Sequence, residues 1–412
     1  MMSISNNNTQ KLYWVSLLSG FNLLEPIMTF FYLSVGLNYT NIFVVLLCFS
    51  VSILIFEIPT GVFADRYGAK KSLLAGTLVK ALSLILLLLA TNEWYVYASQ
   101  VLSGITAAFF SGTVEAILYE SLKEDRREED MAKVYGKIEG AGMLPKMVGL
   151  ILGAWLAKDL TLLQFHILIG LNLLFVLLQI FFVLRIIEPA SLDNYRDHPW
   201  SHVKKGTREI IENPNLLFLF ANVTIIFIGT NIFTNFEQPW FKRLGFPVEA
   251  LGIVFAIGYL LSYLVSTYVG WLTKKVSEVA WMYISGALII ASYVSTVIFD
   301  HSLAVFIMSG LMIRAARSIR WPISSNIGNQ YISTGSRATT LSMLSILDSV
   351  FDVIFIGSLA VVSKWGISEI FWGCAVISLL GILFPVRKKK NPSKVEVKAE
   401  PNGSVGKVEV QS

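Results

Sequence analysis

Long apolar stretches, separated by short polar segments, recur along the whole chain. An α-helix rises 1.5 Å per residue, so crossing a hydrocarbon core ~30 Å thick takes about 20 apolar residues. The pattern therefore predicts twelve transmembrane helices, over 12–36, 41–64, 72–91, 95–121, 134–157, 162–187, 215–238, 248–272, 279–299, 303–330, 339–362 and 367–386.

The longest internal polar stretch, 188–213, leaves six predicted helices on each side. We therefore expect an N-terminal six-helix bundle over 1–187, a linker over 188–213 and a C-terminal six-helix bundle over 214–386. A weak internal repeat supports two pseudo-symmetric halves, because the second helix of each half ends in a glycine-containing, lysine-rich turn. The Lys-, Val- and Glu-rich segment 387–412 is predicted to be a disordered tail.

Composition and charge place this all-α fold in a membrane. Hydrophobic residues make up 54% of the chain and charged residues only 15%, against about a quarter charged in a soluble domain. No basic patch interleaved with aromatic residues indicates nucleic-acid binding. Cys48 and Cys374 lie inside apolar runs, so we expect no disulfide between them. The polar N-terminus lacks a small-residue cleavage site after the first apolar run, which we therefore expect to be a true span.

Lys and Arg residues gather on one side of the predicted helices. With the N-terminus inside, the inner segments carry 21 of them and the outer loops only 4. Cytoplasmic loops carry this excess in membrane proteins. We therefore expect a multi-pass protein of the plasma membrane, with both termini, the linker and the tail in the cytoplasm.

The second predicted helix ends in one polar turn, GVFADRYGAKK. Gly61 would permit close helix packing and Gly68 a tight turn, while Asp65 could cap the next helix or pair with a basic residue across the bundle. The turn resembles the loop between helices 2 and 3 of the major facilitator superfamily, loosely Gly-x-x-x-Asp-Arg-x-Gly-Arg-Lys. The matching residues are Gly61, Asp65, Arg66, Gly68, Lys70 and Lys71, and Ala69 departs from the pattern. The resemblance implies a cytoplasmic gate. The alternative is an ordinary positively charged loop.

Other segments are similar to a branch of that superfamily rich in bacterial drug and metabolite exporters. They are Glu57–Gly61, Ser111–Leu122 and Ser336–Ser342. Two departures from the superfamily's patterns weaken the interpretation of the chain as a proton antiporter. Gln100 stands where proton-linked members often carry an arginine, and the helix-5 signature of the antiporters is only partly matched around Pro145.

Ionisable side chains within the predicted spans mark functional candidates, because an unpaired charge in the bilayer costs several kcal/mol. In the superfamily, helices 1, 4, 7 and 10 line the central cavity. Carried onto this chain, that arrangement implies a substrate and proton path built from Glu25, Asn22, Glu115, Asn231, Asn235, Arg314 and Arg317, with Asp348 and Asp352 beside it. The predicted intramembrane charge network comprises Glu57, Lys80, Glu139 and Lys146.

Pairing among these charges is the alternative to a functional role. Lys80 or Lys146 would then pair with Glu115 or Glu139, and the arginines with Asp348 and Asp352. The two accounts differ in the solute that they imply. Free arginines favour a solute bearing a carboxylate, since a guanidinium matches a carboxylate in fork geometry, whereas neutralised arginines leave a nearly neutral cavity.

Together these features predict a secondary active transporter that exports a small organic drug or metabolite in exchange for protons. No GxxxxGK[ST] loop indicates ATP binding, so an ion gradient would drive transport, with Glu25 or Glu115 carrying the proton. Import by proton symport is the alternative. A sensor or membrane enzyme is a remote alternative, because no HExxH, GxSxG, metal-ligand or cofactor motif occurs. The expected partners are a small-molecule substrate, protons or another coupling ion, and the bilayer, around a monomer.

Overall fold

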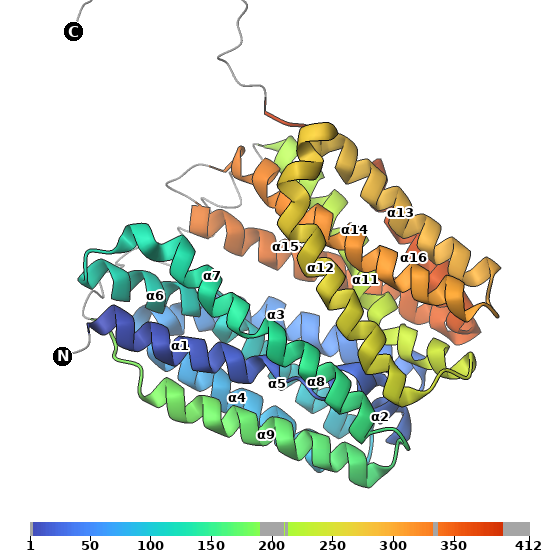
Figure 1. The fold of residues 1–412 in the computed structure, drawn as a ribbon, viewed down its shortest axis with the longest axis horizontal. Coiled ribbons are helices and arrows are strands. Elements are labelled where there is room, and N and C mark those ends of the chain that lie inside the picture. Colours follow the sequence, from blue (N-terminus) through green and yellow to red (C-terminus); the bar gives the residue numbers. More distant parts are fainter. Residues whose placement is uncertain (1–2, 190–209, 211–212, 333–336, 390–412) are drawn as a thin grey trace, which may run out of the picture.

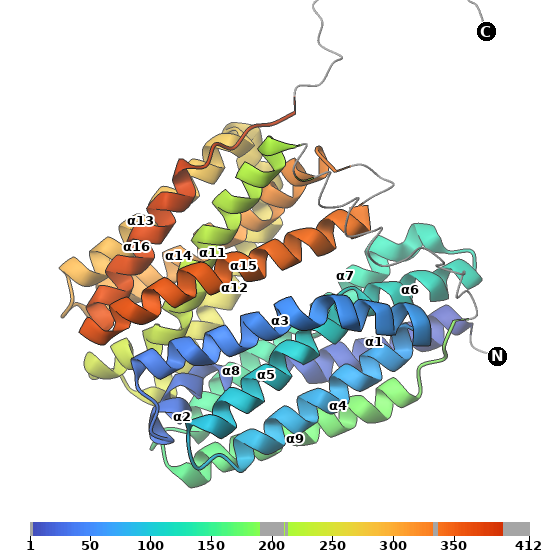
Figure 2. The ribbon, with the colours of Figure 1, turned by 180° about the vertical axis from the view of Figure 1, so that it is seen from behind.

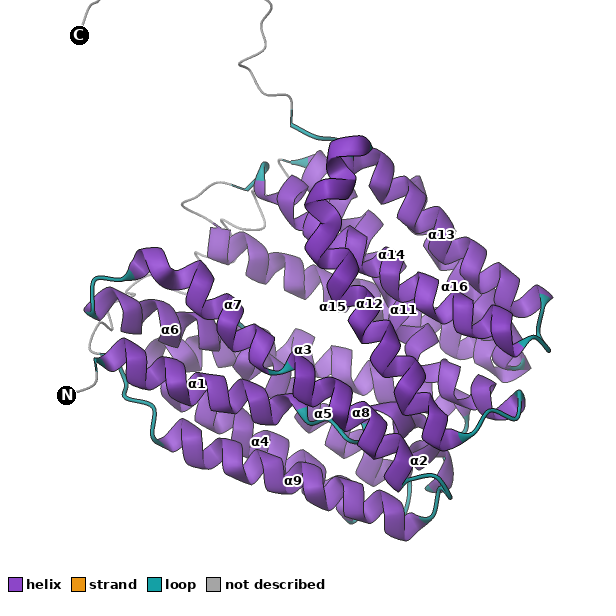
Figure 3. Cartoon of the chain, viewed as in Figure 1, coloured by secondary structure: helices purple, strands orange, loops and turns teal. Residues whose placement is uncertain are grey.

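The computed structural model describes residues 3–189, 210, 213–332 and 337–389. All regular structure in these ranges is helical, which confirms the predicted all-α class (Figure 3). The predicted linker over 188–213 and tail over 387–412 lie mostly outside the described residues.

The first group of helices, which we name the N-half, runs from α1 to α9. Its helices are α1 (Ile4–Gly20), α2 (Met28–Ser34), α3 (Tyr39–Tyr67), α4 (Ala69–Leu88), α5 (Glu93–Phe110), α6 (Thr113–Glu124), α7 (Met131–Ala141), α8 (Met143–Leu156) and α9 (Leu162–Leu184). The second group, the C-half, comprises α11 (Pro214–Arg243), α12 (Val248–Lys275), α13 (Glu278–Ile298), α14 (Leu303–Asn329), α15 (Arg337–Val362) and α16 (Ile367–Leu383).

Three predicted spans are each divided into two helices. The span over 12–36 divides into α1 and α2, 95–121 into α5 and α6, and 134–157 into α7 and α8. The second break contains Gly112 at φ +66°, in the left-handed region that glycine adopts without steric penalty. The first break falls in the mostly apolar segment Phe21–Leu24. An apolar pattern alone does not reveal such a break.

Within the described ranges, nine segments are long and apolar enough to cross a membrane. The other three predicted spans correspond to α7 with α8, to α14 and to α16. The arginines of α14 dilute its apolar character, and α16 has only 17 residues. The arrangement thus fits the twelve predicted spans of an integral membrane protein. Leucines and one phenylalanine that face outward on α9 also suit a lipid environment.

The two halves meet at one end of the molecule and diverge toward the end where the N-terminus lies (Figures 1 and 2). At the meeting end, which we call the junction end, α12 packs against α8, α15 along α3, and α11 against α2. The Thr40 hydroxyl of α3 also lies 2.9 Å from the Ser363 hydroxyl, directly after α15. The ring of Phe236 on α11 stacks on Phe43 of α3, with centroids 5.1 Å apart.

The polar turn between α3 and α4 forms as predicted at Gly68. This residue has φ +96°, and its amide donates to the carbonyl of Ala64. The prediction of close helix packing at Gly61 is wrong in this conformation, because no heavy atom of another described helix lies within 4 Å of the place where a β-carbon would stand. Asp65, Arg66 and Lys71 are exposed and Lys70 is half-buried. The motif therefore forms a charged surface at the end of the molecule where the N-terminus lies.

Candidate functional site: a polar cavity between the halves

A cavity of about 660 Å³ lies between the two halves. Its wall in the C-half comes from α11, α12, α14 and α15, and its wall in the N-half from α3 and the break in the first span. Of the predicted path residues, those that line it are Glu25, Asn231, Asn235, Arg314, Arg317 and Asp352. Its size falls within the range that holds small organic ligands.

The break between α1 and α2 shapes one end of this cavity. Glu25 begins a 3₁₀ turn, Glu25–Ile27, that contains Pro26. Pro26 stands in the first positions of this turn, where its missing amide hydrogen costs no helical hydrogen bond, so it suits a new helical start at this point. The break leaves backbone groups without helical partners, which inside a bilayer must be satisfied by the protein.

Side chains from other helices satisfy these backbone groups. Asn172 of α9 accepts a hydrogen bond from the Leu23 amide at 3.2 Å. Gln238 of α11 accepts from the Thr29 amide at 3.0 Å and donates to the Glu25 carbonyl at 3.0 Å. The broken segment is thereby tied to both halves.

Glycines of the fifth span let it pack closely against the break. A β-carbon at Gly153 would overlap the Leu23 carbonyl, and one at Gly149 would stand 3.3 Å from the Asn22 amide. Gly20 and Gly142, at the ends of α1 and α7, are likewise in direct contact. The breaks in the first and fifth spans are therefore packed against each other.

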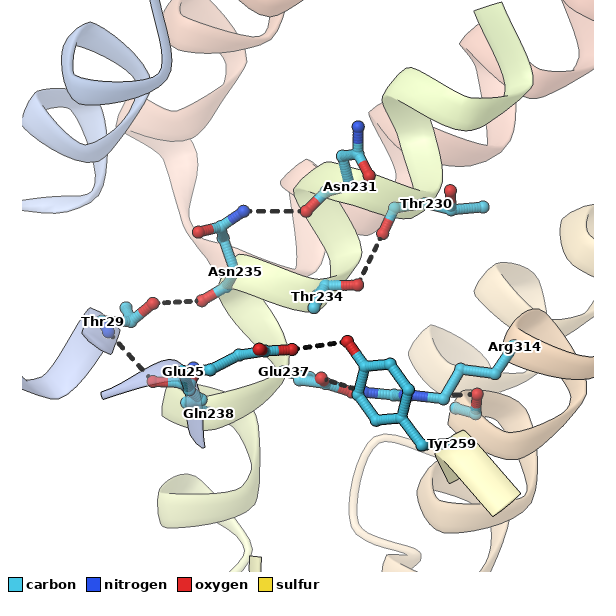
Figure 4. Close-up of polar contacts among 11 residues, drawn as sticks. Glu25, Thr29, Thr230, Asn231, Thr234, Asn235, Glu237, Gln238, Tyr259 and Arg314 are labelled. Atoms are coloured by element: carbon cyan, nitrogen blue, oxygen red, sulfur yellow. Dashed lines mark hydrogen bonds and ion pairs between the residues drawn. The ribbon is translucent and has the colours of Figure 1, made fainter. Parts of the chain in front are cut away.

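The Glu25 carboxylate forms the centre of a polar cluster that crosses between the halves (Figure 4). Lys146 of α8 lies 3.3 Å from its Oε2, and Asn22 donates to the same oxygen at 3.3 Å. From the C-half, the Tyr259 hydroxyl of α12 donates to Oε1 at 2.5 Å. Lys146 also lies 4.2 Å from the centre of the Tyr259 ring. Tyr259, which was not among the predicted site residues, lines this cavity and a second one of about 950 Å³.

A second charged pair lies in the wall of the C-half. Arg314 donates two hydrogen bonds to Glu237, at 3.0 and 2.5 Å, so that guanidinium and carboxylate meet in a fork (Figure 4). The Glu237 side chain is only 2% exposed and that of Arg314 15%. The pair neutralises Arg314. The predicted pairing of Arg314 with Asp348 or Asp352 is therefore wrong. The predicted pairing of Lys146 with Glu115 or Glu139 is also wrong, because Lys146 pairs with Glu25.

Arg317 is held differently, by neutral groups. Its Nη1 donates to Asn231 at 2.7 Å and to Thr230 at 3.2 Å. Of the described carboxylates, none lies within 4.0 Å of it, and Asp348 acts on it only at longer range. Asp352 instead accepts a hydrogen bond at 2.7 Å from Ser50 of α3, across the interface. Asp348 is not among the lining residues.

The remaining predicted residues lie apart from this cavity. Glu115 lies in the first turn of α6 and accepts from the Tyr135 hydroxyl at 2.7 Å, and Glu57 accepts from Ser111 at 3.0 Å. Glu139 lines the second cavity. Lys80 has no carboxylate within 4.0 Å in the described ranges. No ion pair among the described residues joins Glu57, Lys80, Glu139 and Lys146 into the predicted network.

Comparison with known proteins identifies the kind of molecule that this architecture belongs to. The family model described as Major Facilitator Superfamily matches residues 13–356 and 238–410. Multidrug resistance protein 2 of Bacillus subtilis is 23% identical over 93% of this chain and 97% of its own length. The Staphylopine export protein of Staphylococcus aureus is 24% identical over 70% of this chain and 71% of its own. Among solved structures, a D-xylose-proton symporter superposes with a TM-score of 0.73 at 13% identity, covering 93% of this chain and 97% of that one.

Proposed function

The chain belongs to the major facilitator superfamily of membrane transporters, and from this premise we propose that it exports a small organic solute in exchange for protons. The solute would occupy the cavity between the halves. Rocking of the halves would expose that cavity to each side of the membrane in turn, as in other two-half carriers.

The observation that carries the proposal is the placement of Glu25. This carboxylate lies on the cavity wall, next to Lys146 of its own half and Tyr259 of the other half. Separating the halves at the junction end would remove the Tyr259 hydroxyl from Glu25. The protonation of Glu25 and the position of the halves would therefore depend on each other, which is the requirement for coupling a proton to transport. Glu115 is the weaker candidate, because it does not line the cavity.

Relatives support the outward direction, since two of them are named for multidrug resistance and for export. The fold itself serves transport in either direction. The excess of Lys and Arg near the N-terminal end supports a cytoplasmic location for this end. In this orientation the halves meet on the outer side and diverge toward the cytoplasm, where the gate motif Gly61–Lys71 lies.

Proteoliposomes that contain a pH-sensitive dye test the proposal. A panel of anionic, zwitterionic, neutral and cationic compounds is supplied, and solute flux and proton movement are recorded together. We expect that at least one compound crosses the membrane through the unmodified protein and that protons then move in the direction opposite to the compound. Glu25→Gln should abolish this coupling, because an amide cannot release a proton, while Glu249→Gln, at the exposed start of α12, should retain it.

Two results would contradict the proposal. If no compound of the panel crosses the membrane, the chain does not act as an organic-solute carrier. If Glu25→Gln keeps the normal pH dependence of flux, the proton binds elsewhere, and Asp352 becomes the next residue to replace.

A further inference from the structure

Three arginines follow one another along α14, and each has a different environment. Arg314 is paired with Glu237. Arg320 is fully buried away from the cavity, where it donates to Asn222, Ser285 and the Met282 carbonyl. Arg317 lines the cavity, and none of the described carboxylates lies within 4.0 Å of it. Of these three cations, only Arg317 is thus available to an anionic group in the cavity.

The hydrogen bonds of Arg317 orient its free edge. Both of them start from Nη1 and end on the neutral oxygens of Asn231 and Thr230. Neither Nε nor Nη2 donates to any atom of the described residues. Both atoms are accessible, since neither is among the buried polar atoms that lack a partner. A guanidinium binds a carboxylate with two parallel N–H groups. The Nε and Nη2 edge of Arg317 presents such a pair.

Aromatic rings lie near the Arg317 guanidinium. The Phe227 ring centre is 4.8 Å from the Arg317 guanidinium carbon, which covers one face of the group. The Trp321 ring stacks on Phe227 with centroids 6.1 Å apart, lines the same cavity and is 66% exposed. An apolar or aromatic part of a solute can therefore contact a ring surface in the same cavity as the cation.

We propose that Arg317 binds the carboxylate of the transported solute through Nε and Nη2, and that the apolar part of the solute lies against Trp321. This substrate class rests on the proposed function. It differs from the simple expectation of two anion-binding arginines, because Glu237 already occupies Arg314. A single carboxylate, on an amphiphilic molecule, is the group that the cavity accommodates.

Binding to the purified full-length protein tests this inference with three probes of known charge. Radiolabelled benzoate, its neutral counterpart benzamide and the lipophilic cation tetraphenylphosphonium are measured by equilibrium dialysis. We expect benzoate to bind more tightly than benzamide. Arg317→Gln should weaken benzoate binding about tenfold to hundredfold, which corresponds to the loss of hydrogen bonds to a charged group. Arg317→Lys keeps the charge and loses the fork, so its affinity for benzoate should lie between those of the unmodified protein and Arg317→Gln. Arg243→Gln removes an exposed arginine outside the cavity and should change nothing.

The outcomes separate this inference from the proposed function. Unchanged benzoate binding in Arg317→Gln, or no benzoate binding to the unmodified protein, overturns the carboxylate site. Proton-coupled flux of tetraphenylphosphonium that is the same in Arg317→Gln as in the unmodified protein overturns the carboxylate site but is consistent with the carrier function. Benzoate binding that depends on Arg317, without flux of any compound, supports the site and contradicts the carrier function.

Discussion

The ion pair of Glu237 and Arg314 permits a quantitative test of how charges are accommodated in this membrane protein. Its two partners join α11 to α14 through two hydrogen bonds, and the carboxylate is almost fully buried. Removing one partner leaves the other as an uncompensated buried charge. Glu237→Leu alone, or Arg314→Met alone, should therefore lower the free energy of unfolding by about 3–5 kcal/mol.

The double variant Glu237→Leu with Arg314→Met should behave differently. Replacing a whole buried pair by apolar residues of similar volume is often neutral or stabilising, because the desolvation cost of both charges disappears. We expect its unfolding free energy to lie within about 1 kcal/mol of the unmodified protein, or above it. The measurement is an SDS titration in one lipid–detergent mixture, followed by tryptophan fluorescence and analysed as a double-mutant cycle.

A matched pair elsewhere in the chain provides the control. Arg243 and Asp300 also lie 3.0 Å apart, but their side chains are 42% and 32% exposed. Replacing either should cost about 0–1 kcal/mol, as for other surface pairs. The reasoning is refuted if Glu237→Leu costs no more than Asp300→Leu, or if the effects of the two buried substitutions simply add.

Two further predictions concern the gate motif and the packing of the broken spans. Asp65→Asn should reduce solute flux in proteoliposomes about tenfold or more while leaving membrane insertion intact, through loss of the gate; near-normal flux would count against a gate at this turn. Gly153→Leu should prevent recovery of monodisperse protein in size-exclusion chromatography, because the added side chain would overlap the Leu23 carbonyl. Gly170→Leu on α9, where no heavy atom of another described helix lies within 4 Å of a β-carbon, should be recovered normally, and equal recovery of both variants would disprove close packing at the break.

The spans and the tight turn at Gly68 could be predicted because local pattern determines them. Apolar length identifies a span, and a glycine after a charged helix end indicates a turn. The break at Phe21–Leu24 could not be predicted in this way, since these residues are mostly apolar. What stabilises it are Asn172 and Gln238, which lie 149 and 213 residues away in sequence from their partners.

The charged residues of the site were visible in the sequence, but their pairings were not. Spacing along one helix shows which residues share a face, and it contains no information about the facing helix. Glu237 is the buried partner of Arg314, a pairing that the spacing of residues along α14 does not indicate. Tyr259 carried no charge to mark it, although its hydroxyl completes the Glu25 cluster. Only the packing of α11, α12 and α14 distinguishes the neutralised arginine from the available one.

Movement of the two halves around the cavity is the central claim, and a reversible cross-link tests it most directly. The hydroxyls of Thr40 and Ser363 lie 2.9 Å apart across the junction end, close enough for a Thr40→Cys, Ser363→Cys pair to form a disulfide. The native Cys48 and Cys374 are first replaced by alanine. Oxidation should abolish solute flux in proteoliposomes and a reductant should restore it, while the oxidised Thr40→Cys single variant keeps its flux. Full flux through protein whose disulfide is shown to be formed would contradict alternating access by separation of the halves at this end.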